Sequence, residues 1–459
     1  MQDYLRQLEL SDGAPAGTLV GKSFATRVVV LNPDDRIVAE HSIYWKRDGG
    51  ITGAEAARAL VSCRRWRHGS SRSSRARVSR SGCCLRRQPS PYPRSSEHIA
   101  TVQRAQDALA AGKADAALTL ADGVLKVAPA HRDAAAVKIR ALLQLNDRPA
   151  ALKTYDAWLD AARREDVTLL EPIARAELAA LRATPLPLVQ GGALEALALA
   201  GDADAKKALE AAFRSATPTT LTWEATEALA RMGDAAAQKR IVDTASQGAS
   251  GSRVRAIQAI KTLPKTLDLA AVLRRALANG DVMVQVAVAD TAGTLHVKEL
   301  LPDLRRALPT AEPFARLWIA SAMMRLGDGT GEDLLKAALA GTVVDTQLVA
   351  AQAYRDGSDT AWVGRIRPLL TADEALNRLF AAELLATVDR PKAFDVLKKG
   401  LSDPNHVVRG EAARILTETN IYDIWTLRWM IRDGAPLVRF LAARAILADA
   451  TSQMGPRPG

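Results

Sequence analysis

The stretch Ser402–Leu416 reads SDPNHVVRGEAARIL and contains a complete boundary between two helices. The residue before Pro404 is disfavoured in the α region, so a preceding helix should end there. Asn405 can then accept a hydrogen bond from an unpaired amide and cap the next helix. Apolar residues follow at helical spacing and predict one buried helix face: Val408, Ala412, Ile415 and Leu416.

This pattern is repeated along the C-terminal part of the chain. Eight units follow one another at steps of 30 or 31 residues, and we place the start of the second helix of each unit at Glu224, Arg255, Gln285, Arg316, Gln347, Arg378, Arg409 and Arg439. Four positions later every unit has an alanine, namely Ala228, Ala259, Ala289, Ala320, Ala351, Ala382, Ala413 and Ala443. Residues 190–450 are therefore predicted to form an α-solenoid whose helices pack closely at these alanines.

Residues 97–185 are also periodic, with a spacing of 34 residues. Ala117-Leu118 matches Ala151-Leu152, and Asn146 stands where Gly112 stands in the preceding unit. This pattern predicts two helix pairs, followed by a helix over Pro172–Arg182. The period and the small residues where paired helices cross resemble tetratricopeptide repeats.

The longer array, with its D-P-x-x-x-V-R-x-x-A-A-x-x-L arrangement, resembles short HEAT repeats of the type found in phycobilisome lyase subunits. Only Asp403/Arg409 and Asp433/Arg439 keep the family's pairing of an aspartate with an arginine six positions later. The resemblance implies an all-α solenoid and one enzymatic alternative, a bilin lyase or isomerase subunit. A second alternative is a nucleic-acid binder similar to the alkylpurine DNA glycosylases, which are built from HEAT-like helices.

The net charge of +11 is concentrated in one short segment. Residues 61–96 contain ten arginines and no lysine, aspartate or glutamate, whereas residues 97–459 carry a net charge of only +2. The segment is interpreted as a disordered linker, as an arm that neutralises phosphates, or as sequence read out of frame from GC-rich DNA. Because the repeats are nearly neutral, we expect them to bind no specific nucleic acid.

The remaining segments are short. Residues 1–60 predict a small α/β piece with strands over Phe24–Leu31 and Ile37–Tyr44 and a helix over Ala54–Leu60. Residues 451–459 are expected to be a disordered tail. The N-terminus MQDYLRQLEL lacks the apolar stretch of a signal peptide, and no run of about 18 apolar residues is present, so we expect a cytoplasmic protein that does not enter a membrane.

No pattern in the sequence predicts catalysis or a cofactor. The spacing of Cys63, His68, Cys83 and Cys84 fits no tetrahedral zinc site, so no metal is expected. Trp318, Trp362, Trp425 and Trp429 are predicted to pack in the core or between repeats.

One row of polar residues is the candidate binding surface. It lies five positions after the alignment residue and consists of Asp290, Ser321, Gln352, Glu383, Arg414 and Arg444. Because these residues are polar on otherwise apolar helices, we expect them to line an exposed edge of the second helices; the alternative is that they are ordinary exposed positions. The sequence thus favours a non-enzymatic scaffold that binds a protein partner along the repeats.

Overall fold

The computed structural model describes residues 24–31, 37–45, 96–215, 217, 219–263, 268–278, 280–355 and 360–454. The chain divides into two units, Met1–Gln88 and Pro89–Gly459. In the first unit, strands β1 (Phe24–Leu31) and β2 (Ile37–Trp45) pair antiparallel, with a register shift between Val30 and Leu31. Both predicted strands are confirmed, whereas the predicted helix over Ala54–Leu60 lies outside the described residues.

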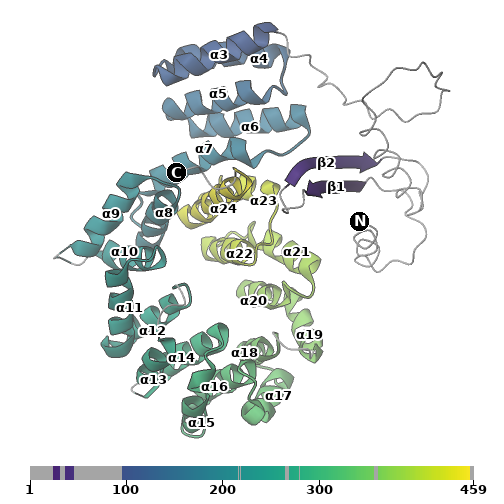
Figure 1. Cartoon of the computed structure of the whole chain (residues 1–459). Coiled ribbons are helices and arrows are strands. Elements are labelled where there is room, and N and C mark those ends of the chain that lie inside the picture. The colour runs from purple at the N-terminus through teal and green to yellow at the C-terminus, as the bar shows by residue number, and fades with distance from the viewer. Residues whose placement is uncertain are drawn as a thin grey trace, which may run out of the picture. The chain divides into compact units, whose positions relative to one another are not determined.

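The second unit is helical throughout its described residues (Figure 1). Its first helices are α3 (Ser96–Ala110), α4 (Ala114–Val127), α5 (Arg132–Gln144), α6 (Arg148–Ala162), α7 (Val167–Leu181) and α8 (Pro187–Leu199). The next are α9 (Ala203–Arg214), α10 (Thr220–Arg231), α11 (Ala235–Gln247), α12 (Ser250–Ile260), α13 (Leu269–Ala278) and α14 (Val282–Leu295).

Short 3₁₀ turns at Lys298–Leu300, Gly329–Gly331 and Arg367–Thr371 adjoin some of the later helices. These helices are α15 (Leu301–Ala307), α16 (Pro313–Arg325), α17 (Glu332–Ala340), α18 (Val344–Tyr354), α19 (Ala361–Ile366), α20 (Ala375–Leu385), α21 (Arg390–Gly400), α22 (His406–Glu418), α23 (Ile424–Met430) and α24 (Pro436–Met454). The predicted all-α solenoid is confirmed for this unit.

From α8 onward the helices form two layers. The even-numbered helices α8 to α24 make the inner layer and the odd-numbered helices α9 to α23 make the outer layer (Figure 1). Ser250 at the start of α12 hydrogen-bonds Asp281, the N-cap of α14, and Arg409 in the first turn of α22 bonds Asp433 just before α24. The inner helices therefore run parallel, with their N-termini at one edge of the solenoid.

The aligned alanines lie in the core, as predicted. All eight are at most 7% exposed, and seven are fully buried. The predicted helix starts were too late, because α14 and every later inner helix begins three residues before its alignment residue. Residues at the first turn make no intrahelical amide bonds, so sequence periodicity marks the beginning of a helix poorly.

Glycine and asparagine form several of the turns between helices. Gly112 and Asn146 occupy equivalent positions and both have a left-handed backbone, with φ of 72° and 61°. Gly233 also has a left-handed backbone, with φ of 94°. Asp234 then caps α11 by accepting a hydrogen bond from the amide of Ala237. The predicted start of α7 at Pro172 was wrong, because Asp166 caps a helix that starts at Val167 and retains the proline in its interior.

Four of the five aligned arginines bond the loop before their own helix, whereas Arg255 pairs with Glu224 and Glu227 of α10. Arg316 donates to the carbonyl of Ala311 at 2.9 Å, and Arg378 donates to that of Ala372 at 2.7 Å. Arg409 reaches the carbonyl of Asp403 at 2.9 Å and also the carboxylate of Asp433 in the next unit. These side chains are thus internal partners within the solenoid.

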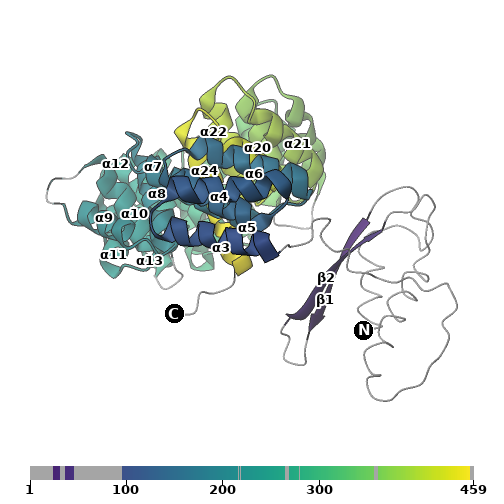
Figure 2. The same cartoon turned by 90° about the horizontal axis from the view of Figure 1, so that it is seen from above.

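The solenoid closes on itself, which the sequence did not predict. The last helix, α24, lies beside α7 and α8, where the array begins (Figures 1 and 2). The Glu177 carboxylate of α7 accepts from Arg439 of α24 at 2.8 Å and from Arg148 of α6 at 3.0 Å. The buried side chains from Ala135 to Ala450 form one continuous hydrophobic core through this junction.

Gly192 of α8 permits the closest approach at the junction. A Cβ atom there would lie 2.4 Å from Cζ of Phe440, a buried residue of α24. The ring of Phe440 occupies the space that a Cβ atom at this position would need, so a larger residue would require the ring to move.

Leucine at two of the aligned alanines should destabilise the second unit. Ala320→Leu and Ala351→Leu would overpack contacts that are fully buried, at a cost of about 1–3 kcal/mol each. Ala337→Leu is the matched control, because Ala337 is exposed on α17. Denaturant midpoints of the three variants test this; equal midpoints would show that the alanines do not lie at close contacts.

Gly192→Leu should open the closed solenoid. The leucine side chain would displace Phe440 and separate α24 from α8. Small-angle X-ray scattering should then show a larger radius of gyration and maximum dimension. Gly123→Leu on α4 is the control, because a Cβ at Gly123 meets nothing within 4 Å; identical scattering curves for the two variants would contradict the dependence on this contact.

Candidate protein-binding surfaces

The polar row does lie along the inner helices, one residue per helix from α14 to α24. Its exposure is uneven. Arg444 is exposed, Asp290, Gln352, Glu383 and Arg414 are half-buried, and Ser321 is only 3% exposed. The prediction of an exposed edge was therefore wrong at Ser321, where the hydroxyl donates to the Val349 carbonyl of the next inner helix at 3.4 Å.

Most charges of the polar row are neutralised by neighbouring helices. Asp290 forms an ion pair with Lys261 of α12. Its other carboxylate oxygen accepts a hydrogen bond from Nε2 of Gln352 at 3.4 Å. Gln352 lies on α18, two inner helices farther along the array. The small Ser321 lies on the helix between them. The row therefore links successive units, and its role in binding a partner stays a prediction.

Arg414 is the centre of the largest charge cluster in this row. Its guanidinium donates to Glu383 of α20 at 3.1 Å and to Glu411 at 2.6 Å, and it also pairs with Glu418. Burial disfavours the charged form, but hydrogen bonding to Glu411 and the nearby carboxylates outweigh it and raise the pKa of Arg414 above its usual value. Arg414 thus carries a permanent charge that its neighbours already satisfy.

A second row on the same helix face was missed by the sequence reasoning. It lies seven residues before the polar row, which is two helical turns. We call it the apolar row, and its members are Met283, Phe314, Leu376, Val407 and Leu437. Met283, Phe314 and Val407 are 53%, 45% and 54% exposed. The fixed offset was visible in the sequence, but apolar residues on a periodic helix were assigned to the core.

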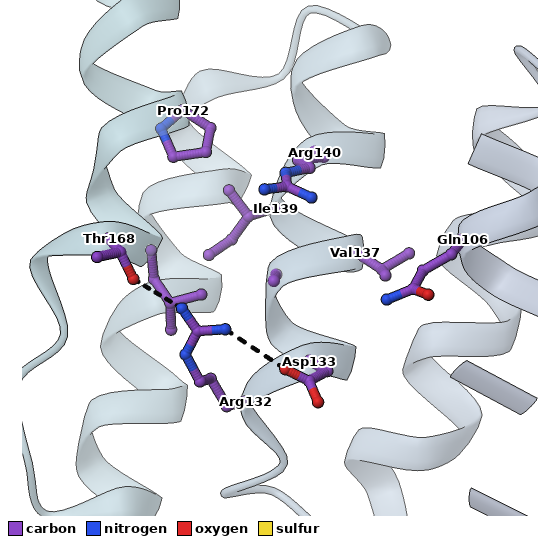
Figure 3. A pocket seen from close by; sticks show the side chains of 10 residues that line it. Gln106, Arg132, Asp133, Val137, Ile139, Arg140, Thr168 and Pro172 are labelled. Atoms are coloured by element: carbon purple, nitrogen blue, oxygen red, sulfur yellow. Dashed lines mark hydrogen bonds and ion pairs between the residues drawn. The ribbon is translucent and has the colours of Figure 1, made fainter. Parts of the chain in front are cut away.

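A small pocket lies outside the closed array, between α3, α5 and α7 (Figure 3). It has a volume of about 100 Å³, with Gln106 on one side, Val137 and Ile139 on α5, and Pro172 on the other side. It is therefore large enough for one small side chain or a few water molecules.

Two arginines border this pocket: Arg132 is paired with a carboxylate, and Arg140 is exposed. Arg132 donates to Asp166 and to Thr168, both at 2.7 Å. Burial opposes the charge of Asp166, but hydrogen bonds from Thr168 and Arg132 outweigh it and lower the pKa of this carboxyl group. Arg140 is exposed, and no ion-pair partner for it is found among the described residues.

The tryptophans fall into two groups. Trp362 is buried as predicted, but Trp425 and Trp429 on α23 are 62% and 43% exposed, so the prediction of packing was wrong for these two. Arg428, between them in the sequence, is buried and pairs with Asp156 of α6. Its guanidinium carbon lies 4.6 Å from the centre of the Trp425 ring and covers one face of it.

Within the described residues, no helix is long and apolar enough to cross a membrane. The same part of the chain contains no group of three or more His, Cys, Asp or Glu side chains placed to hold a metal ion. The described residues do not include Cys63, His68, Cys83 or Cys84. They include only Ser96 of the arginine-rich segment 61–96.

Comparison with known proteins found no matching family model and no similar curated protein. The second unit is nevertheless defined by its architecture: successive helices pack on their neighbours, in two layers from α8 onward, and one large hydrophobic cluster runs from α5 to α24 beside a smaller one in α3 to α5. It is a helical-repeat protein of the α-solenoid class.

Removing the Arg414 side chain should destabilise the solenoid. Arg414→Met would leave three carboxylates close together without their cation, which we expect to cost about 1–3 kcal/mol. Arg444→Met is the control within the same row, because Arg444 is exposed and its guanidinium lies over the Phe440 ring at 5.3 Å. Chemical denaturation at low and high salt tests this. Indistinguishable midpoints for the two variants would show that the Arg414 cluster is not structural.

Proposed function

We propose that the protein is a non-enzymatic scaffold that binds a protein partner along its helical-repeat surface, with tetratricopeptide-like units before HEAT-like units. The main support is the repetition of one exposed helix face from unit to unit, since each repeat adds a similar patch beside the last. The apolar row and the polar row share this face, so a partner would meet both.

The charges of the same face favour a protein over a nucleic acid. A phosphate backbone is bound by cations that are free to displace its counterions. Lys261 and Arg414 are instead paired with Asp290 and Glu383. A protein partner can use the exposed apolar side chains beside these pairs without breaking them.

Affinity purification of the tagged full-length chain from its native cells tests the scaffold. We expect at least one protein to be retained in a fixed ratio after nuclease treatment, and no salt-resistant binding of duplex DNA by the purified chain. Loss of all bound protein on nuclease treatment, or DNA binding that persists at high salt, would favour the nucleic-acid alternative.

A further inference from the structure

The apolar row occupies one edge of the inner layer. Its members lie in the first turn of α14, α16, α20, α22 and α24, and the N-termini of the inner helices share this edge. At the corresponding place α18 has Asp345, but its N-cap residue Val343 is 59% exposed. Every inner helix from α14 onward thus has an apolar residue at the same edge.

The exposed members of the row are Met283, Phe314 and Val407, whereas Leu376 and Leu437 are half-buried against the hydrophobic core. Outer helices and neighbouring inner helices cover the other sides of each inner helix, and the residues two turns later on the exposed face belong to the polar row. The ion pairs Lys261–Asp290 and Glu383–Arg414 already neutralise the polar row. A partner would therefore gain binding energy on this face mainly by burying the exposed side chains of the apolar row.

Unpaired carboxylates flank the apolar row. Glu312, Asp345 and Asp373 are exposed at the N-terminal ends of α16, α18 and α20, and no ion pair joins them to another described residue. A ligand that covers Phe314 and its neighbours would therefore bring its own polar side near several negative charges. Cations on that side would be favoured.

We infer that the apolar row binds an amphipathic α-helix of a partner protein, with its apolar side against Met283, Phe314 and Val407 and a basic polar side near the flanking carboxylates. Packed helices lie about 8–10 Å apart. Residues seven positions apart in a helix are separated by about 10.5 Å along its axis. A helix laid across the inner layer would thus present one apolar residue to each repeat. This inference rests on the proposed scaffold function and names its partner class.

A synthetic helical peptide of about 21 residues provides the probe, with leucines along one side and lysines along the other, labelled for fluorescence anisotropy. We expect it to bind the full-length chain, and the double variant Met283→Ser/Phe314→Ser to bind it at least about tenfold more weakly. A peptide of the same composition in shuffled order should bind neither protein. Both substituted residues are about half exposed, and circular dichroism and melting curves confirm that the variant is folded.

The control is the double variant Leu145→Ser/Leu334→Ser, which removes two leucines of similar exposure, 42% and 37%, from other surfaces. It should bind the peptide as the unaltered chain does. Failure of the patterned peptide to bind the unaltered chain, or equal affinities for both double variants, would overturn the inference. If a native partner is purified and the Met283→Ser/Phe314→Ser variant retains it, the scaffold function stands and this surface is not its binding site.

Discussion

The distance between neighbouring inner helices is the constraint on which the rest of this fold depends. A helix can approach its neighbour only as closely as the side chains between them allow, and in each of the eight aligned units that place is occupied by a buried alanine. Close approach lets polar side chains bond between units, as Gln352 of α18 reaches Asp290 of α14 across Ser321 of α16. It also sets the curvature that brings α24 to α7 and α8, where Gly192 of α8 and Phe440 meet without space for another methyl group.

This close spacing explains why the side chains of the polar row pair between units, whereas those of the apolar row do not. At the middle of each inner helix, charged side chains from adjacent helices are near enough to pair, as Arg414 and Glu383 do at 3.1 Å. At the N-terminal edge, aligned arginines such as Arg316 bond carbonyls of the preceding loop, and the neighbouring Phe314 stays 45% exposed. A polar residue on a repeat helix is therefore a weaker sign of a binding surface than its chemistry suggests, because its nearest partner is the next repeat.

Local chemistry made much of the fold predictable from the sequence. Proline, asparagine and glycine marked the turns, and the alanine period gave the packing face, since both depend on residues close together in the chain. Closure was not predictable, because Glu177 and Arg439 are 262 residues apart and no local pattern relates them. The same reason hid the burial of Ser321 and the exposure of Trp425, both of which depend on which helix lies alongside. The residues of the apolar row recur with the same period as those of a buried helix face, so the sequence alone did not distinguish the two.

Closure has a consequence for how such a protein could evolve. An open solenoid can gain or lose a unit by duplication or deletion, because its ends are free and only a terminal cap must be retained. Here the last helix is buried against the first part of the array, and one carboxylate, Glu177, receives arginines from both sides of the junction. An extra unit of about 31 residues would displace α24 from this contact, so the copy number of the repeat is fixed by geometry, and variation is confined to substitutions within units.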